Sequence, residues 1–406
     1  MEYNDTIHNE NRACVLPFLI TDNQWTFYDN ISWWLEGLGS IIIGSLGILF
    51  NITTIIVVLG SDLAASFFNW LLICLALFDS LFLLTGILEA FRNHVGSSYV
   101  HDYVFVMFLY PFRSVAMCCS IYMTITLAVE RHNALITPTA GHRRGSINPT
   151  NRTLNNYFKT HRRRVIKYVG PIVIFAILFY LPKFFELRLV RHAKGSSNET
   201  GNYYEFTHEV QLSGLRKNNQ YILWYLNVTN LLITAAIPLI ALAYLNFNIC
   251  SQLKTYVKRQ PSVRKSVAEN FNSDAKKKIQ RKEKDVIAQT IVLFTIVVLF
   301  VLFHTLRIVL NIEELVTLNN VAGDKEQGCT WLQYWTLVAV PISHILLSLN
   351  SSMNLFIYCF CNSSFKNVLR SKFAGISYLC TRNEIVREEL EHEMQETNRL
   401  TINIQL

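Results

Sequence analysis

The sequence predicts an all-α membrane protein, a seven-transmembrane helix bundle followed by a short amphipathic helix. Hydrophobic residues make up 51% of the 406 residues and charged residues only 16%, whereas soluble globular proteins carry about 25% charged residues. The apolar residues fall into runs long enough to cross a bilayer, which takes about 20 residues per helix. The last run carries Asn350, Asn354 and Tyr358 at four-residue spacing. These polar groups share one helical face, which must lie against protein or trapped water.

Seven apolar runs have the length of a transmembrane helix, and each is expected to form one span. The fourth run has the least distinct ends, because Arg162, Arg163 and Arg164 crowd its start. A re-entrant segment in place of one span is the alternative. The expected spans are residues 35–59, 67–91, 103–133, 165–187, 221–253, 285–312 and 331–361. The expected parts of the chain are an N-terminal segment (residues 1–34), the bundle (35–361), a basic amphipathic helix on the membrane surface (362–374) and a tail (375–406).

Loop charges predict the orientation of the bundle. Lysines and arginines crowd residues 143–167 and 254–284, so the positive-inside rule places both loops in the cytoplasm. The N-terminal segment holds five acidic residues against the single basic residue Arg12, and is expected outside. We therefore expect a multi-pass protein of the plasma membrane with an extracellular N-terminus. No apolar run precedes Trp33, so the first span is expected to act as its own insertion signal.

The extracellular segments contain candidate modification sites. Asn4, Asn30 and Asn198 each begin an Asn-x-Ser/Thr sequence and are candidate glycosylation sites. Of the nine cysteines, only Cys14 and Cys329 fall in segments assigned to the outside, where disulfides persist. Two external cysteines have one possible pairing, so a Cys14–Cys329 bridge is predicted. Two free thiols are the alternative.

The cytoplasmic segments suggest contacts with the membrane. Cys380 lies shortly after the amphipathic stretch and is a palmitoylation candidate, with an ordinary thiol as the alternative. The strongly basic loop of residues 251–284 suits anionic lipid. We expect membrane lipid, and no nucleic acid, as a partner.

Five motifs, each in the expected span and order, resemble those of the rhodopsin-like (class A) G-protein-coupled receptors. They are Asn51 in the first span, Leu75-Ala76-Leu77-Phe78-Asp79 for L-A-x-x-D, Glu130-Arg131-His132 for D/E-R-Y, Pro238 in the fifth span, and Asn354-Leu355-Phe356-Ile357-Tyr358 for N-P-x-x-Y. The resemblance covers about residues 35–373. It implies a receptor rather than an enzyme, with an extracellular ligand, a heterotrimeric G protein, arrestin and receptor kinases as partners.

The polar residues inside the spans predict an ion site. Asp79 is a lone carboxylate deep in the bilayer, which is costly unless it is partnered. Ser120 lies eleven residues before Arg131, about three helical turns further out on the same face. Together with Asn350 and Asn354, these residues predict an oxygen-rich cage for a monovalent cation. The resemblance implies sodium, acting as an allosteric modulator, and no other cofactor is expected. The alternative is a water-filled polar network around a protonated Asp79, and the two differ in whether sodium lowers agonist affinity.

The cytoplasmic ends of the third and last spans predict an activation switch. Glu130 is expected to hold Arg131 in the resting state. The resemblance implies that Arg131 is released on activation to meet the G protein, while Tyr358 of the Asn354–Tyr358 motif swings inward. A plain interfacial charge pair is the alternative.

Several family positions are occupied by other residues. Val106 stands where the family has its third-span cysteine, and residues 190–220 contain no cysteine. The predicted extracellular bridge is a candidate substitute for that missing disulfide. Leu306 and Leu355 replace the prolines of the sixth and last spans, and the usual tryptophans of the fourth and sixth spans are absent. The sequence therefore does not indicate how the helices of this bundle move on activation.

Ionisable residues in the outer halves of the spans predict a ligand pocket. The last span has no lysine for a retinal Schiff base, and Arg113 stands where amine receptors carry a carboxylate. Opposite charges suit a short charged peptide, whose basic side chain meets a carboxylate. Mutual neutralisation of these groups within the bundle is the alternative. The candidate ligand-binding residues are Glu89, Arg113, Glu186, Arg307, Glu313 and His344.

Three local sequences narrow the resemblance to invertebrate FMRFamide-type neuropeptide receptors. Leu181-Pro182-Lys183-Phe184-Phe185-Glu186 resembles their P-[RK]-F-F-E, the stretch from Asn350 to Cys359 is similar to their N-S-S-x-N-F-x-I-Y-C, and the stretch from Ser120 to Arg131 resembles their third span. The resemblance implies a small amidated neuropeptide ligand. Our hypothesis is that the arginine of the peptide pairs with Glu89 or Glu186. Its amidated phenylalanine then enters between the third, sixth and seventh spans.

Other functions remain to be weighed. An orphan or divergent class A receptor for another peptide or small ligand would share all of these motifs. A seven-span transporter would show inverted repeats and interrupted helices, and a membrane enzyme would show clustered metal ligands or a nucleophile with its base. We see neither pattern. A ligand-dependent G-protein or arrestin response separates receptors from both classes.

Overall fold

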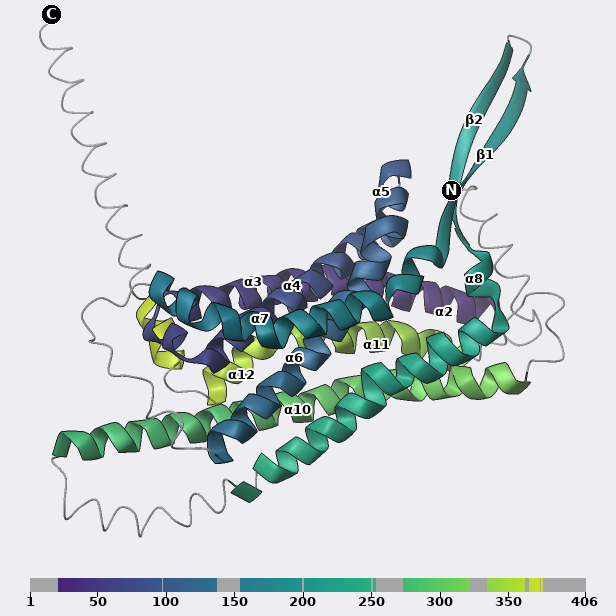
Figure 1. The fold of residues 1–406 in the computed structure, drawn as a ribbon. Coiled ribbons are helices and arrows are strands. Elements are labelled where there is room, and N and C mark those ends of the chain that lie inside the picture. Colours follow the sequence, from purple (N-terminus) through teal and green to yellow (C-terminus); the bar gives the residue numbers. More distant parts are fainter. Residues whose placement is uncertain are drawn as a thin grey trace, which may run out of the picture.

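The structure is a computed structural model of the chain, and it describes residues 21–96, 98–136, 154–198, 201–249, 251–252, 273–320, 334–361, 365–372 and 374. Among these residues, six helices are long and apolar enough to cross a membrane. They correspond to the first six expected spans and run alongside one another (Figure 1). The helical membrane architecture is therefore confirmed for six spans.

The first helix begins earlier than the sequence predicted. Helix α2 (Asp22–Ser32) continues through the π-helical turn η1 (Trp33–Gly39) into α3 (Ser40–Leu59). Its start is fixed by Gln24, whose side-chain oxygen accepts a hydrogen bond from the Thr21 backbone at 2.8 Å. The predicted start at residue 35 marks only where the apolar run begins, because hydropathy does not detect the polar first turns of a helix.

The second and third helices form the centre of the bundle. The 3₁₀ turn η2 (Asp62–Ala65) leads into α4 (Phe67–His94). The third span consists of α5 (Tyr99–Val104), the π-helical turn η3 (Phe105–Leu109) and α6 (Tyr110–Ile136). Helix α4 packs against both α3 and α6, so residues of α4 can contact both neighbours.

The fourth span ends earlier than predicted and is followed by a β-hairpin. Helix α7 (Leu154–Phe179) stops before the 3₁₀ turn η5 (Leu181–Phe185), in which Pro182 cannot donate the backbone hydrogen bond that would continue the helix. Strands β1 (Leu187–Asn198) and β2 (Gly201–Leu212) then pair in antiparallel fashion, with Leu187 opposite Leu212. The hairpin projects from the end of the bundle where α2 and α8 (Gly214–Lys217) lie (Figure 1). The fold is therefore not purely α-helical.

The fifth and sixth spans differ in regularity. The fifth contains the π-helical turns η6 (Tyr221–Thr229) and η7 (Leu232–Ala236) before a regular helix at residues 237–249. The sixth is α10 (Ser273–Asn320), an unbroken helix of 48 residues with a length of about 70 Å. Its first turns extend beyond the neighbouring helices (Figure 1). Leu306, at the place of the expected proline, leaves this helix without a break.

The seventh expected span is described as two helices, α11 (Tyr334–Ser352) and α12 (Asn354–Cys361). Backbone hydrogen bonds of 3.0 Å (Met353 N to Leu349 O) and 3.2 Å (Ile357 N to Met353 O) carry the chain across the junction. These two helices cover most of the expected span but are not among the six helices above. The expected surface helix is described at residues 365–372, where buried Phe365 packs against Tyr358.

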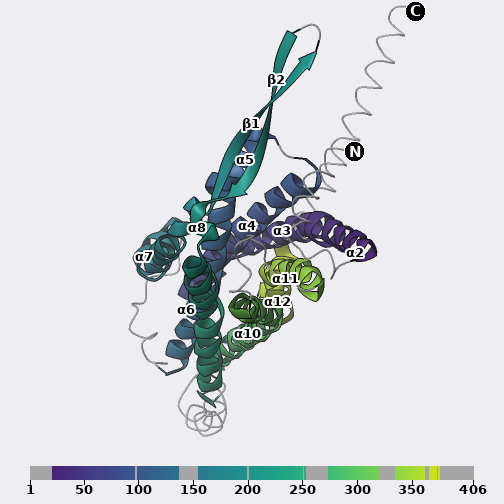
Figure 2. The same cartoon turned by 90° about the vertical axis from the view of Figure 1, so that its right-hand side faces the viewer.

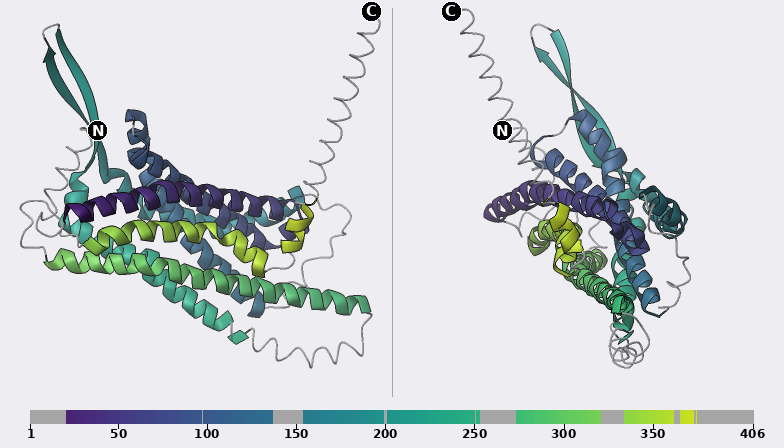
Figure 3. Two further views of the ribbon diagram at one scale, coloured as in Figure 1. Left: turned by 180° about the vertical axis from the view of Figure 1, so that it is seen from behind. Right: turned by 90° about the vertical axis from the view of Figure 1, so that its left-hand side faces the viewer.

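Close packing joins the first, second and seventh spans. The pair α11–α12 lies between α3 and α10 (Figure 3), while α7 lies at the edge of the bundle against α6 (Figure 2). At Gly47, a Cβ atom would lie 2.8 Å from Ser352 Cβ and 2.7 Å from Leu83 Cδ1, so a side chain at this position would force the neighbouring helices apart. The half of the bundle that the loop charges assign to the cytoplasm holds the main apolar core, which includes Val57, Leu71, Leu75, Met123, Leu127, Leu242 and Ile249.

Candidate functional site

A polar centre at mid-bundle joins three spans. Asp79 on α4 is 1% exposed. Ser120 Oγ on α6 donates to its Oδ1 at 2.6 Å, and Asn354 Nδ2 on α12 donates to its Oδ2 at 2.7 Å. The structure therefore brings together three of the four residues predicted for the ion site. The carboxylate is held from two sides by donors on other helices.

Asn350 lies beside this centre rather than on the carboxylate. It lines a small cavity together with Ser120 and Ser351, with room for about one water-sized group. The Ser351 side chain is a further hydrogen-bond partner of Asp79, and the sequence analysis missed it. Asn51 Nδ2 on α3 donates to the Ser351 carbonyl at 3.2 Å. The other residues that line the cavity are Phe82, Met117, Ile121, His304 and Leu347.

The chemistry of these groups fits a hard cation. The Asp79 carboxylate meets the Ser120 hydroxyl and the Asn354 amide there, and carboxylate, hydroxyl and amide oxygens are the ligands that hard cations prefer. Asn51 Oδ1 is buried without a hydrogen-bond donor, so one acceptor near the centre is left for a water molecule or an ion. The arrangement is compatible with both the sodium and the water-network interpretations.

Of the predicted activation residues, Asn354 belongs to the polar centre, and the other three lie further along α6 and α12. Tyr358 is 2% exposed within the main apolar core, with its ring centroid 5.7 Å from that of Phe365. Glu130 and Arg131 lie near the end of α6. The side chain of Arg131 is outside the described part, so the Glu130–Arg131 pair stays a prediction.

Glu186 is the centre of a buried cluster in the half of the bundle that the loop charges assign to the outside, hereafter the outer half. It is 0% exposed. Tyr110 donates a hydrogen bond to it from α6, and Tyr221 from η6 at 2.7 Å. Arg216 Nε lies 3.8 Å from its Oε2. Glu186 therefore ties the third, fourth and fifth spans together through partners that the sequence did not predict.

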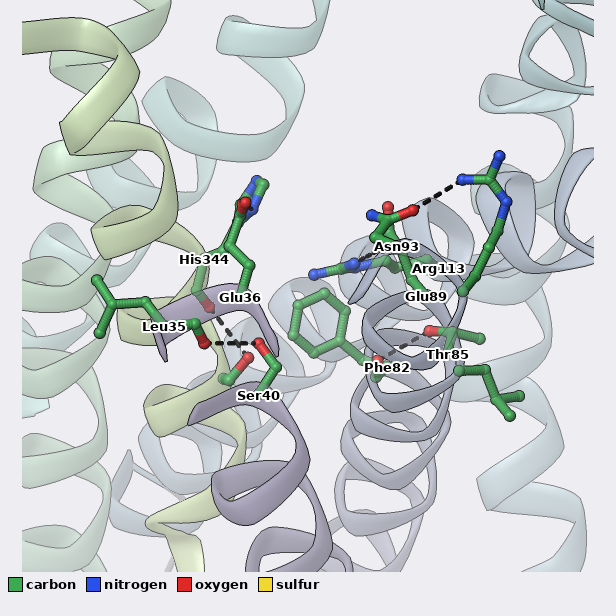
Figure 4. Close-up of polar contacts among 12 residues, drawn as sticks. Leu35, Glu36, Ser40, Phe82, Thr85, Glu89, Asn93, Arg113 and His344 are labelled. Atoms are coloured by element: carbon green, nitrogen blue, oxygen red, sulfur yellow. Dashed lines mark hydrogen bonds and ion pairs between the residues drawn. The ribbon is translucent and has the colours of Figure 1, made fainter. Parts of the chain in front are cut away.

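Two further pairs of ionisable side chains lie in the outer half (Figure 4). Arg113 on α6 pairs with Glu89 on α4, and its guanidinium lies 5.3 Å from the ring centroid of Phe82. His344 Nδ1 on α11 lies 2.6 Å from Glu36 Oε1 on η1. Glu36 is missing from the predicted site. The sequence feature that could have identified Glu36 is its position as a lone carboxylate at the edge of the first apolar run.

The two remaining predicted ligand residues lie on α10. Arg307 has no ion pair or hydrogen bond with any described residue, and its Nε atom is buried without a partner. Glu313 is half-buried further out on the same helix. The charge of Arg307 is acted on by Glu314 and Tyr180, but its Nε atom is left without a direct contact partner within the described part of the chain.

A cluster outside the bundle holds the hairpin against the third span. Asp102 on α5 is 3% exposed. Its Oδ1 lies 2.6 Å from Arg92 Nε on α4, and its Oδ2 lies 3.1 Å from His208 Nε2 on β2. The Tyr99 ring packs edge-on against His208 at 5.7 Å, and Arg191 lies over Tyr99 at 3.9 Å. This cluster, hereafter the clasp, was not predicted from the sequence. It joins the third span to the loop after the fourth span, the two segments that the disulfide of the rhodopsin-like family would join.

Removal of the Asp102 charge is expected to loosen the hairpin. In Asp102→Asn, one charge-assisted bond is lost on each side of the clasp, at a cost of about 1.5–3 kcal/mol. Hydrogen–deuterium exchange of the purified protein should show faster exchange in β2 and unchanged exchange in α4. Glu209→Gln, an exposed change on the same strand, is the control. Equal exchange in both variants would show that the clasp does not hold the hairpin.

The predicted modification sites are not tested. Cys14, Cys329, Asn4 and Cys380 lie outside the described residues, and nothing is described for the side chain of Asn198. Asn30 is exposed on α2. The disulfide, glycosylation and palmitoylation sites therefore stay predictions.

Comparison with known proteins gives two matches. A family model described as "Serpentine type 7TM GPCR chemoreceptor Srw" matches residues 39–375. The chain is also similar to the FMRFamide receptor of Drosophila melanogaster, with 27% identity over 348 residues, which cover 84% of this chain and 54% of that receptor. The chain thus spans about half the length of this relative. The family that matches is that of the Srw chemoreceptors, and the assignment to the rhodopsin-like class stays a prediction.

Proposed function

Because the chain belongs to the Srw family of serpentine seven-transmembrane G-protein-coupled receptors, we propose that its ligand is a short, C-terminally amidated, FMRFamide-like neuropeptide. Membership of this family makes the chain a receptor rather than an enzyme, with an extracellular ligand and a G protein as its partners. The likeness to an FMRFamide receptor over 84% of the chain carries the peptide proposal. The plasma membrane as location, an extracellular N-terminus, and regulation by receptor kinases and arrestin belong to the same proposal.

Glu89 is the better of the two predicted partners for a peptide arginine. Its side chain is 26% exposed and has Arg113 as its partner. Glu186, by contrast, is fully buried with Tyr110, Tyr221 and Arg216 around it. A ligand guanidinium at Glu89 has to displace one competing cation, whereas at Glu186 it would have to break the whole cluster.

The contacts of Arg113 suggest how binding reaches the polar centre. Its guanidinium lies over Phe82, and Phe82 lines the cavity beside Ser120, which in turn donates to Asp79. In the proposed mechanism, a peptide arginine takes over Glu89 and releases Arg113. Phe82 then moves and alters the cavity. This change weakens the hydrogen bond that Asn354, at the start of α12, donates to Asp79. That helix leads to Tyr358 and the cytoplasmic surface.

Sodium is proposed as the modulator at the polar centre. Asp79, Ser120 and Asn354 would supply its first oxygens, and Asn350 and Ser351 would line its access. The bound ion would neutralise the buried carboxylate and favour the resting arrangement. A peptide that alters the cavity would then compete with sodium through Phe82.

The peptide proposal is tested by replacing Glu89. We expect cells that express the receptor to give a G-protein response to Phe-Met-Arg-Phe-amide. Glu89→Gln should lower its potency by about 10- to 100-fold, the range expected for a hydrogen bond to a charged group. A peptide in which neutral citrulline replaces arginine should lose potency on the wild type and lose little more on the variant.

The control for this experiment is Glu209→Gln, an exposed change on β2, with surface expression measured for each variant. An equal loss of potency for the arginine and citrulline peptides would contradict the pairing with Glu89. A second candidate, a receptor for a different small ligand, is favoured by the description of the matching family as chemoreceptors. It predicts a response to other compounds and none to amidated peptides.

A further inference from the structure

Three buried nitrogen donors lie on two packed helices without acceptors. They are Asn227 Nδ2 on η6, and Arg307 Nε and Asn311 Nδ2 on α10. Elements η6 and α10 pack against each other. Buried side-chain donors are nearly always paired in folded proteins, so three unmatched donors on adjoining elements require an explanation.

The positions of these residues indicate that they face the interior of the bundle. Arg307 and Asn311 are four residues apart, so they lie on one face of α10. His304, three residues before Arg307, continues this face and lines the cavity next to Ser120. Asn227 is 1% exposed on the facing helix. The donors therefore lie within the outer half rather than against lipid.

Three carboxylates of the described outer half have other partners. Glu186 accepts from Tyr110 and Tyr221, Glu89 pairs with Arg113, and Glu36 pairs with His344. No described carboxylate lies within ion-pair distance of Arg307. Glu314 and Tyr180 act on the Arg307 charge at longer range, but the buried Nε atom of Arg307 has no hydrogen-bond acceptor in the described part of the chain, and leaving a buried donor of a charged group unpaired is costly.

We propose that Arg307, Asn311 and Asn227 form a subsite for the carbonyl oxygen at the C-terminal end of the peptide ligand. The inference rests on the proposed function and deepens it. A chain terminus presents an oxygen that no following residue screens, so it can enter between the fifth and sixth spans. A carboxamide and a carboxylate both offer such an oxygen. This position differs from the one expected from the sequence, which placed the terminal phenylalanine between the third, sixth and seventh spans.

Three peptides test this subsite on the full-length receptor in cells. They are Phe-Met-Arg-Phe-amide, the corresponding free acid, and an analogue in which phenethylamine replaces the last residue and thus removes the terminal carbonyl. On the wild type, the analogue should be about 10- to 100-fold weaker than the better of the other two. In Arg307→Gln and in Asn311→Leu this gap should shrink to about threefold or less. Arg188→Gln, an exposed change on β1, should leave the gap unchanged.

The relative potency of the amide and the acid identifies which terminus the subsite prefers. If Arg307→Gln weakens the acid more than the amide, the subsite takes a carboxylate; an equal loss indicates the carboxamide. A gap that persists unchanged in both Arg307→Gln and Asn311→Leu would overturn the proposal.

A second readout separates this subsite from the peptide proposal. Without ligand, purified Arg307→Gln should melt about 2–4 °C above the wild type, because it removes a partly buried charge whose Nε atom has no partner. Arg188→Gln should show no shift. If Arg307 instead serves the fold, the variant melts lower and the subsite is refuted. If the wild type responds to none of the three peptides, the proposed ligand is wrong, and the melting shift alone then decides whether Arg307 lacks a partner.

Discussion

Agonist affinity in the Asp79→Asn variant is expected to be independent of sodium, whereas sodium should lower the agonist affinity of the wild type by about 5- to 150-fold. The substitution keeps the size of the side chain and one acceptor oxygen, so Ser120 or Asn354 can still donate to it. It removes the single charge that would hold a cation at the centre. The G-protein response to agonist should fall as well, because the two donors that bridge α6 and α12 to Asp79 no longer share one carboxylate.

Agonist competition binding in sodium chloride and in choline chloride of equal ionic strength measures this effect. Ser80→Ala is the control, because Ser80 lies next to Asp79 and its hydroxyl donates at 2.7 Å to Ala76 of its own helix. A sodium effect that survives in Asp79→Asn would refute the ion site. A wild type that shows no sodium effect would favour the water-filled network. The experiment therefore separates the two interpretations that the sequence left open.

The polar centre was predictable because few residues in the spans can form it. Asp79 is a single carboxylate in an apolar run, and helical spacing alone places Ser120 above Arg131 and Asn354 in line with Asn350. Burial in lipid requires such groups to find one another. Ser351 escaped prediction because its neighbour Asn350 was the more polar residue of the same turn, and only the rotation of α11 determines which of the two contacts Asp79.

The outer half was predictable in composition but not in pairing. The sequence named Glu89, Arg113, Glu186 and His344, yet it could not show that His344 pairs with Glu36 or that Tyr110 and Tyr221 donate to Glu186. Pairing depends on the rotation of each helix. The π-helical turns η1, η3 and η6 lie in the outer parts of the first, third and fifth spans, and each shifts the face that follows it. Spacing rules for a regular α-helix fail across such turns.

The clasp and the hairpin escaped prediction for a related reason. Strands β1 and β2 contain alternating polar and apolar residues, but they lie in a loop region that was treated only as a place without cysteines. Asp102 belongs to helical turns that precede the expected third span. Long-range contacts between a loop and a helix end leave no periodic signal in the sequence.

Replacement of Glu186 with Leu is expected to cause the largest loss of stability among these variants, about 3–5 kcal/mol. The change leaves two tyrosine hydroxyls without their acceptor and Arg216 without its partner, at the junction of three spans. Thermal melting of the solubilised receptor and its surface expression measure the loss. The exposed Glu209→Gln change should leave both unaffected.

A rescue variant shows whether unsatisfied donors cause that loss. Adding Tyr110→Phe and Tyr221→Phe to Glu186→Leu removes the orphaned hydroxyls, and removal of both partners of a buried hydrogen bond is often nearly neutral. The triple variant should therefore melt well above Glu186→Leu alone. If it melts lower still, the aromatic hydroxyls have other essential partners and the cluster is not centred on Glu186.

In the milder Glu186→Gln variant, the potency ratio of the arginine and citrulline peptides should equal that of the wild type, in contrast to Glu89→Gln. A collapse of this ratio would move the peptide arginine from Glu89 to Glu186, and ligand binding would then have to open the joint between the third, fourth and fifth spans.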